Sequence, residues 1–198
     1  QYIYENIAQI ACGYGAGNPS LHKRSNGTLQ VMFKRKEFVT KLKNYGLAPL
    51  KAPYKRVPKA IFSASEETVK AYLNGLFSSD GTVNYADENH RDIRLSSASR
   101  QLLQDVQLLL LNLGIFSSIY TREKTNQNVF RYIDKNGEER TYAGGTYYEL
   151  IISGNDMYNF SQEIRDLVHK EKNLKLKKAA KLSRKKTKFI AKVLSVEE

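Results

Sequence analysis

The sequence predicts an α+β protein with an antiparallel sheet, and two patterns along its 198 residues support this. Stretches with apolar residues at helical spacing alternate with pairs of short runs rich in β-branched and aromatic residues. From residue 63 onward the order is helix, two strands, helix, two strands, helix. That order is typical of an α+β fold with an antiparallel sheet.

Each element rests on a local signal. In chain order the patterns predict helices over residues 1–12, 34–47, 63–81, 99–114 and 155–167. They predict strands over residues 28–33, 82–88, 91–99, 117–125 and 146–154, with a further hairpin inside 126–145. Residues 48–58 contain three prolines and predict a loop. The inward faces are expected at Phe38, Val39, Leu42, Val69, Leu73, Leu76, Phe77, Leu102, Leu103, Val106, Leu109, Leu110 and Leu113.

The composition favours a nucleic-acid partner. Thirty-two basic against 20 acidic side chains give a net charge of +12, and 13 tyrosines accompany the charge. Such a field concentrates a polyanion; the alternative is a basic protein with a solvated lysine surface. No apolar run is long enough to cross a membrane, and no basic amphipathic helix has an aromatic-anchored apolar face, so no membrane partner is expected. The single cysteine, Cys12, excludes an internal disulfide framework. With no secretory leader in view, it predicts a reducing, cytoplasmic location.

A loose repeat suggests the domain organisation. A strand, a helix and then Lys55 in the first part parallel a strand, a helix and then Lys170 in the second. We therefore expect residues 1–62 to be the tail of a first lobe, residues 63–182 a second lobe, and residues 183–198 a basic linker leading to another segment.

The helix over residues 63–81 carries an unusual side. Ser63, three residues before Glu66, predicts its N-terminal cap. Ala71, Gly75 and Ser79 recur every four residues, so they form a stripe on which a second helix could pack closely. The helix ends at Asp80-Gly81, where a carboxylate opposes the helix dipole. A divalent cation would reverse that cost; an ordinary turn is the alternative.

These residues resemble the LAGLIDADG motif of homing endonucleases, in the form found in intein-borne members. Within residues 72–83 the motif positions are occupied by Leu73, Gly75, Leu76, Phe77, Asp80 and Gly81, whereas Ser78 and Ser79 stand where Asp-Ala is usual. Residues 55–62 resemble the segment that leads into the second motif of two-motif members. Residues 168–174 resemble the lysine-bearing segment after the last strand, and residues 189–198 resemble the start of the C-terminal splicing block of inteins.

The resemblance implies a fold and a mechanism. The family fold has two pseudo-symmetric lobes, a saddle of antiparallel strands that enters the DNA major groove, and two motif helices packed at the centre. It implies a metal site at Asp80 and Gly81 that takes Mg²⁺, with Asp80 as the catalytic carboxylate. Lys55 and Lys170 match the one lysine per lobe near each scissile phosphate. Expected base readers on the outward sheet face are Asn84, Arg94, Arg122 and Lys124.

One departure leaves alternatives open. The family needs one aspartate from each of two motifs, and this chain has one recognisable motif. The chain could be part of a longer protein, with a first lobe and splicing segments elsewhere. It could also be a one-motif form completed by another chain, or a lobe that has kept only DNA binding. We expect metal-dependent cleavage of a long double-stranded DNA site, with a non-cleaving DNA- or RNA-binding maturase or regulator as the alternative. These residues alone carry no terminal Cys, Ser or His-Asn for splicing.

Overall fold

The computed structural model describes residues 2–25, 27, 29–47, 49–87, 90–123, 130–133, 137–142 and 145–181. The first part of the chain forms a small α-β-β-α unit with the elements α1 (Tyr2–Gly13), β1 (Ser20–Lys23), β2 (Leu29–Met32) and α2 (Lys36–Asn44). A connection follows that contains a 3₁₀ turn η1 (Ala52–Tyr54) and a short helix α3 (Lys59–Phe62). The expectation of an irregular loop at residues 48–58 was therefore incomplete, because Pro53 is accommodated in the first turn of η1.

The second part of the chain, called the second lobe below, begins with the long helix α4. Its elements are α4 (Glu66–Ser79), β3 (Gly81–Tyr85), β4 (Arg91–Ser97), α5 (Arg100–Asn112), β5 (Ser118–Glu123), β8 (Thr146–Ser153), α6 (Asp156–Glu163) and α7 (Lys170–Lys181). A separate hairpin interrupts the course from β5 to β8 and consists of β6 (Phe130–Ile133) and β7 (Glu139–Tyr142). This hairpin lies within residues 126–145, where the sequence predicts one.

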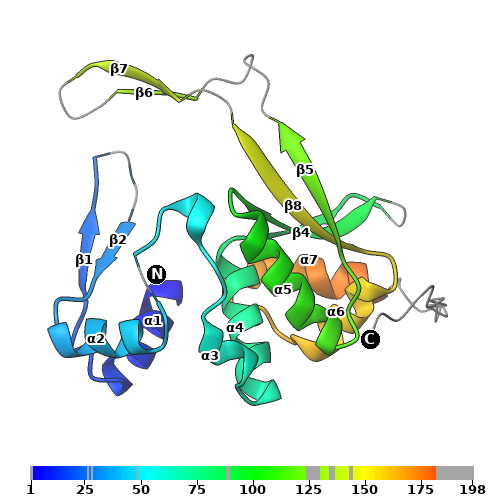
Figure 1. The fold of residues 1–198 in the computed structure, drawn as a ribbon, viewed down its shortest axis with the longest axis horizontal. Coiled ribbons are helices and arrows are strands. Elements are labelled where there is room, and N and C mark those ends of the chain that lie inside the picture. Colours follow the sequence, from blue (N-terminus) through cyan, green and yellow to red (C-terminus); the bar gives the residue numbers. More distant parts are fainter. Residues whose placement is uncertain are drawn as a thin grey trace, which may run out of the picture.

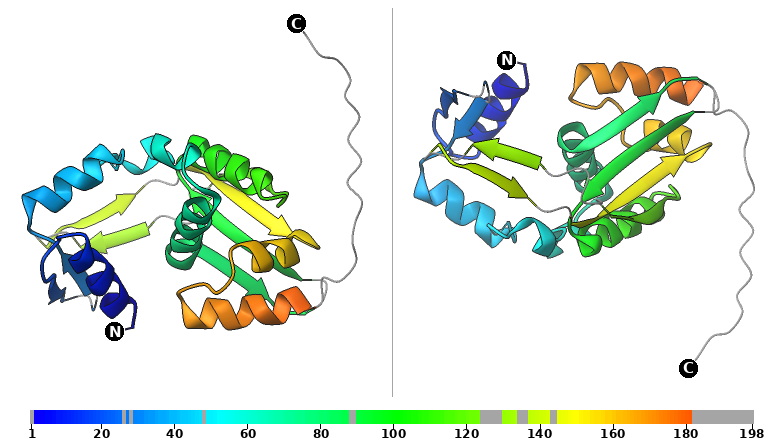
Figure 2. Two further views of the ribbon diagram at one scale, coloured as in Figure 1. Left: turned by 90° about the horizontal axis from the view of Figure 1, so that it is seen from below. Right: turned by 90° about the horizontal axis from the view of Figure 1, so that it is seen from above.

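The sheet of the second lobe has four antiparallel strands in the order β3-β4-β8-β5. Helices α5, α6 and α7 lie on one of its faces, and no helix lies on the other in the part of the chain that the structure describes (Figures 1 and 2). The hairpin β6–β7 reaches beyond the sheet toward the small unit (Figure 1). The predicted α+β fold with an antiparallel sheet is confirmed.

The core lies between this sheet and the helices. Leu73 and Phe77 of α4 pack in one cluster with residues of β4, α5, β8 and α6, and Phe77 meets Phe160 edge to face at 4.9 Å between ring centroids. The periodicity of α5 is confirmed, since its five predicted leucine and valine positions 102, 103, 106, 109 and 110 are buried and Leu113 packs against them. Alternation along β4 and β8 places Ile93, Leu95, Leu150 and Ile152 against the helices.

The small unit differs from the expectation. No residue of α2 is buried, and Val39, predicted to point inward, is 40% exposed. In α1 the apolar residues Ile7 and Ile10 are also exposed. The sheet of this unit, β1–β2, has only two strands, and a two-stranded sheet offers too little apolar surface for a core.

Candidate active site

The helix α4 stands between the two parts of the molecule and ends at the sheet (Figure 1). Its N-terminal cap is Ser65, whose Oγ accepts a hydrogen bond from the Thr68 backbone N–H at 3.4 Å. The prediction of Ser63 as the cap was wrong, because the short helix α3 extends to Phe62 and Ser63 closes that helix instead.

The last turn of α4 presents a carboxylate. Asp80 is the C-terminal cap residue, its backbone N–H bonds to the Leu76 carbonyl at 2.9 Å, and its side chain is exposed. Among the described residues, no side chain is hydrogen bonded or ion-paired with this carboxylate. Gly81 is required for space: a Cβ there would lie 2.6 Å from the Phe77 carbonyl oxygen and 2.9 Å from Phe77 Cα. Glycine at this position therefore allows β3 to start in close contact with α4.

A lysine from α7 caps this helix end. Lys172 Nζ donates hydrogen bonds to the carbonyl oxygens of Ser78 at 2.8 Å and Ser79 at 3.0 Å, with the Phe77 carbonyl at 3.5 Å. The carbonyls of Ser78 and Ser79 lie in the last turn of α4, where a helix supplies no N–H partners of its own. Burial lowers the pKa of Lys172 from its ordinary value, and the nearby Asp80 charge opposes that shift. The ammonium thus offsets the cost of placing Asp80 at the negative end of the helix dipole.

Sequence reasoning missed Lys172. Lys170 begins α7 two positions earlier and is exposed; its catalytic role stays a prediction. Lys172 is the residue of this lysine-rich segment that the structure brings to the end of α4. Whether Lys170 or Lys172 points inward depends on the rotation of α7 about its axis. The sequence offered one signal for that rotation: Leu176, which is buried in the structure, lies one helical turn after Lys172 and therefore on the same side of the helix.

Two polar residues of the motif hold the segment that precedes Lys172. Asn74 Nδ2 donates to the carbonyls of Ile164 at 3.0 Å and Asp166 at 2.8 Å, on either side of Arg165, whose φ of 56° lies in the left-handed region. Ser78 Oγ accepts from the Val168 N–H at 2.9 Å and donates to Asn74 Oδ1 at 3.1 Å. The buried serine at the usual Asp position therefore anchors the chain that leads into α7.

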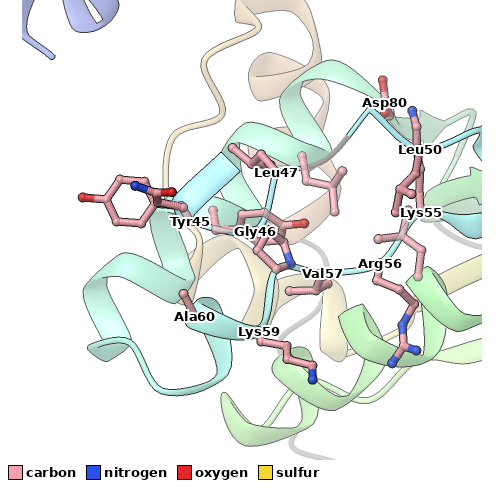
Figure 3. Close-up of a pocket in the computed structure, with 15 residues that line it drawn as sticks. Tyr45, Gly46, Leu47, Leu50, Lys55, Arg56, Val57, Lys59, Ala60 and Asp80 are labelled. Carbon is pink, nitrogen blue, oxygen red and sulfur yellow. The ribbon is translucent and has the colours of Figure 1, made fainter. Parts of the chain in front are cut away.

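Lys55 approaches Asp80 from the connection that contains η1 and α3, whereas Lys172 comes from α7. It lines, together with Asp80, Leu76 and Leu102, a pocket of about 570 Å³ between the connection and α4. Figure 3 shows the Lys55 side chain extending toward Asp80, whose carboxylate lies at the same end of the pocket. The structure thus brings Lys55 and Asp80 together, and it adds Lys172 at the end of the same helix.

The small-residue stripe of α4 faces outward. Ala71, Gly75 and Ser79 are all exposed, and a Cβ built on Gly75 meets no atom within 4 Å. Within the described part of the chain no helix packs on this stripe. Its role as a helix-packing surface therefore stays a prediction that concerns another segment or chain.

The predicted base readers lie on the face of the sheet that the helices leave open. Asn84, Arg94 and Arg122 occupy the outward positions of β3, β4 and β5, and Lys124 lies outside the described residues. Arg122 Nε donates to Glu149 at 2.8 Å, and its guanidinium carbon lies 5.5 Å from the centre of the Tyr120 ring. Their contact with bases stays a prediction.

Asp92 organises the middle of this face. Arg94 donates to both oxygens of Asp92, at 2.7 and 2.8 Å, and Asn84 donates at 2.7 Å. Burial is the largest single influence on the pKa of Asp92 and raises it. The hydrogen bonds from Arg94 and Asn84, together with the charge of Arg94, outweigh burial and hold the pKa below its ordinary value. The open face therefore carries arginines already fixed in orientation by carboxylates.

The donor set at the end of α4 fits Mg²⁺. The described residues contain no group of three or more His, Cys, Asp and Glu side chains that could enclose a metal ion. Mg²⁺ does not need one, since it keeps several waters and is commonly bound by one or two carboxylates and substrate phosphates. The exposed carboxylate of Asp80 matches such a ligand, and Lys172 leaves it free by bonding to the backbone.

Comparison with protein families identifies the class. The model of the LAGLIDADG-like domain matches residues 67–165, which include all of α4 except Glu66, the whole four-stranded sheet, α5 and α6. The chain belongs to the LAGLIDADG-like domain family.

The curated relatives that match are much larger proteins. The chain is 34% identical over 165 residues to the ribonucleoside-diphosphate reductase NrdEB subunit alpha of Bacillus subtilis, covering 79% of this chain and 15% of that protein. It is 41% identical over 75 residues to a probable translation initiation factor IF-2 of Thermococcus kodakarensis, covering 38% of this chain and 6% of that protein. It is 38% identical over 73 residues to a DNA polymerase of Thermococcus sp. GE8, covering 37% of this chain and 4% of that protein.

Proposed function

We propose that this chain is part of a site-specific, metal-dependent homing endonuclease that cleaves double-stranded DNA and is carried within an intein. The observation that carries the proposal is the end of α4, where the free carboxylate of Asp80 is accompanied by Lys55 in one pocket and Lys172 on the helix terminus. A hard oxygen ligand with two ammonium groups nearby is suited to a phosphodiester that gains negative charge during hydrolysis.

Each residue has a distinct task in this proposal. Asp80, with phosphate oxygens of the substrate, would hold Mg²⁺, which polarises the phosphoryl oxygen and lowers the pKa of an attacking water. Lys55 would place its ammonium against the phosphate charge that develops. Lys172 would keep the end of α4 fixed and add positive potential, since its own hydrogen bonds are directed to the helix carbonyls.

DNA recognition is assigned to the open face of the sheet. The net charge of +12 favours binding to a polyanion, and paired strands can enter the major groove. Asn84, Arg94 and Arg122 project from that face, and arginine paired with guanine is the commonest specific contact in this groove.

The intein setting rests on the kinds of relative. A reductase, a translation factor and a DNA polymerase share no common task, yet the same kind of segment matches a small share of each. A segment inserted into unrelated hosts explains this pattern. We accordingly propose that a first lobe and splicing segments complete the protein, in the same precursor or another chain, in the cytoplasm. The structure describes no helix with the length and apolarity needed to cross a membrane.

A second candidate is a LAGLIDADG-like protein that binds DNA or RNA without cleaving it. The observation in its favour is that the described residues place a single carboxylate, Asp80, at the site. A second acidic residue from another motif favours the nuclease, and a neutral residue there favours the binding protein.

Plasmid cleavage with the complete precursor tests the proposal. The substrate carries the uninterrupted gene of the host protein, and reactions contain Mg²⁺ or EDTA. Glu67→Gln is the matched control for Asp80→Asn, because Glu67 is an exposed carboxylate in the first turn of the same helix. We expect a double-strand cut at one site that requires Mg²⁺, persists in Glu67→Gln and is lost in Asp80→Asn. Equal cutting by Asp80→Asn would overturn the assignment, and salt-sensitive binding without any cut would support the second candidate.

A further inference from the structure

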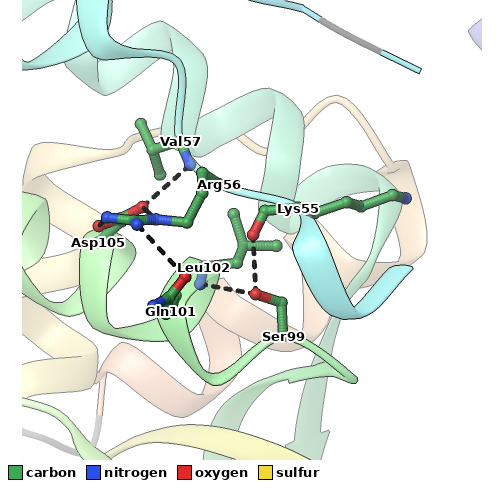
Figure 4. Close-up of polar contacts among 7 residues, drawn as sticks. All are labelled: Lys55, Arg56, Val57, Ser99, Gln101, Leu102 and Asp105. Carbon is green, nitrogen blue, oxygen red and sulfur yellow. Dashed lines mark hydrogen bonds and ion pairs between the residues drawn. The ribbon is translucent and has the colours of Figure 1, made fainter. Parts of the chain in front are cut away.

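The backbone around Lys55 is held by polar side chains of α5. Ser99 Oγ donates to the Lys55 carbonyl at 2.7 Å and accepts from the Leu102 N–H at 3.1 Å, so it caps α5 and fixes Lys55 at once (Figure 4). Asp105 accepts from the backbone N–H of Val57 at 3.2 Å. The Lys55 carbonyl and the Val57 N–H, which flank Arg56, are therefore both hydrogen bonded to side chains of α5 and its N-terminal cap.

Arg56 completes this arrangement. Its Nε and one terminal nitrogen donate to the two oxygens of Asp105 at 2.6 and 2.8 Å, and its other terminal nitrogen reaches Gln101 at 3.3 Å. The bonds and charge of Asp105 raise the pKa of Arg56. Planar two-point pairing of this kind fixes direction as well as distance, and Figure 4 shows the Lys55 side chain leaving on the opposite side from Arg56.

The burial of the helix residues makes the arrangement rigid. Ser99 is 1% and Asp105 8% exposed, and the neighbouring Val57 is buried in the main core. Buried polar groups are costly without partners, so these bonds discourage other backbone paths for residues 55–57. Because α4 and α5 share that core, Asp80 and the residues that hold Lys55 belong to one packed body.

We propose that Asp105, Arg56 and Ser99 act as positioning residues that hold Lys55 beside Asp80. Lys55 belongs to the connection between the two parts of the molecule, whereas Asp80 belongs to the second lobe. The three positioning residues, called the clamp below, hold Lys55 in a position that does not depend on the position of the small unit. Its catalytic consequence rests on the proposed function; its structural consequence does not.

Carbodiimide crosslinking of the chain tests the position without requiring activity. The reagent activates the Asp80 carboxylate, the Lys55 amine displaces the activating group, and mass spectrometry quantifies the resulting amide link. The link between Lys70 and Glu163, an ion pair of 2.6 Å away from the clamp, is the internal reference. We expect the ratio of the two links to fall about threefold or more in Arg56→Gln and in Asp105→Asn, since placement by the clamp is lost.

The matched control is Arg100→Gln, which removes the same charge from the first, exposed position of α5. Its crosslink ratio should equal that of the unmodified chain. Circular dichroism identifies any variant that has unfolded. If one has, Arg56→Lys is used in its place, because lysine keeps the charge but cannot form the two-point pairing. An unchanged ratio in folded Arg56→Gln, or no 55–80 link in the unmodified chain, overturns the proposal.

Cleavage by the complete precursor then tests the consequence. Arg56→Gln should lower the single-turnover cleavage rate by about 10- to 100-fold, a usual cost of misplacing a catalytic group by an ångström or so. In a Lys55→Met background the same change should cost nothing further, because the clamp acts through Lys55. Additive losses would assign the clamp a general structural role. If the precursor does not cleave, the proposed function fails, and the crosslink ratio still decides the position.

Discussion

Gly75 offers a test of the exposed stripe that needs only this chain. It lies inside α4, a Cβ there meets nothing within 4 Å, and its φ is not positive. Alanine is better than glycine in a helix interior by about 0.8–1.0 kcal/mol. Gly75→Ala should therefore raise the free energy of unfolding by about 1 kcal/mol, and the Tm by about 2–4 °C for a chain of this size.

Gly154→Ala is the matched control. A Cβ at Gly154 also meets nothing within 4 Å, but φ is +61°. The same added atom should destabilise the chain by about 1 kcal/mol, because the left-handed region is unfavourable for alanine. Urea unfolding followed by circular dichroism measures both variants. A loss of stability in Gly75→Ala would show that the stripe is already covered, and would refute the reasoning.

In the complete precursor, Gly75→Ala should lower the free energy of unfolding instead of raising it. If a second motif helix packs on Ala71, Gly75 and Ser79, an added methyl group separates the two backbones and lowers stability. A stability gain in this chain together with a stability loss in the precursor would show that a second helix packs on this stripe. A gain in both would exclude such packing.

Three further outcomes are expected. Gly81→Ala should lower the free energy of unfolding by about 1–3 kcal/mol, because the 2.6 Å approach to the Phe77 carbonyl cannot relax without moving α4; a change below about 0.5 kcal/mol would contradict this account. Lys172→Met should cost about 1–2 kcal/mol through the lost bonds to the carbonyls of α4, whereas Lys178→Met, on the exposed side of α7, should leave urea unfolding nearly unchanged. The lowered pKa of Asp92 contributes stability that is present above pH 3.8 and is lost as the pH falls through the folded-state pKa. In acid titrations Asp92→Asn should therefore show a shallower loss of stability; an identical slope would remove Asp92 as a contributor.

Much of the second lobe follows from local patterns. The leucine periodicity of α5 specifies its buried face, and alternation in β4 and β5 places Arg94 and Arg122 outward, since side chains alternate across a strand. Asp80 at the end of α4 follows from the spacing of the apolar positions. These features depend on neighbours a few residues apart, which a sequence displays directly.

The environment of the site depends on distant partners instead. Arg56 and Asp105 are far apart in the chain, as are Lys172 and the end of α4. A lysine-rich sequence offers several candidates for each contact, and one-residue changes in helix phase select among them. The roles of Ser99 and Asp105 gave no separate signal, because a serine before a helix and an aspartate within one are common.

The strand order also constrains when the second lobe can form. The central pair of the sheet joins residues 92–97 of β4 to residues 148–153 of β8, and the β6–β7 hairpin lies between them in the chain. Contacts between distant segments form slowly, because a long loop must close first. During synthesis α4, β3, β4 and α5 therefore emerge while Ile93 and Leu95 still lack the core residues that β8, α6 and α7 contribute. The nascent chain depends on residues beyond 153 before its apolar surface is removed from water.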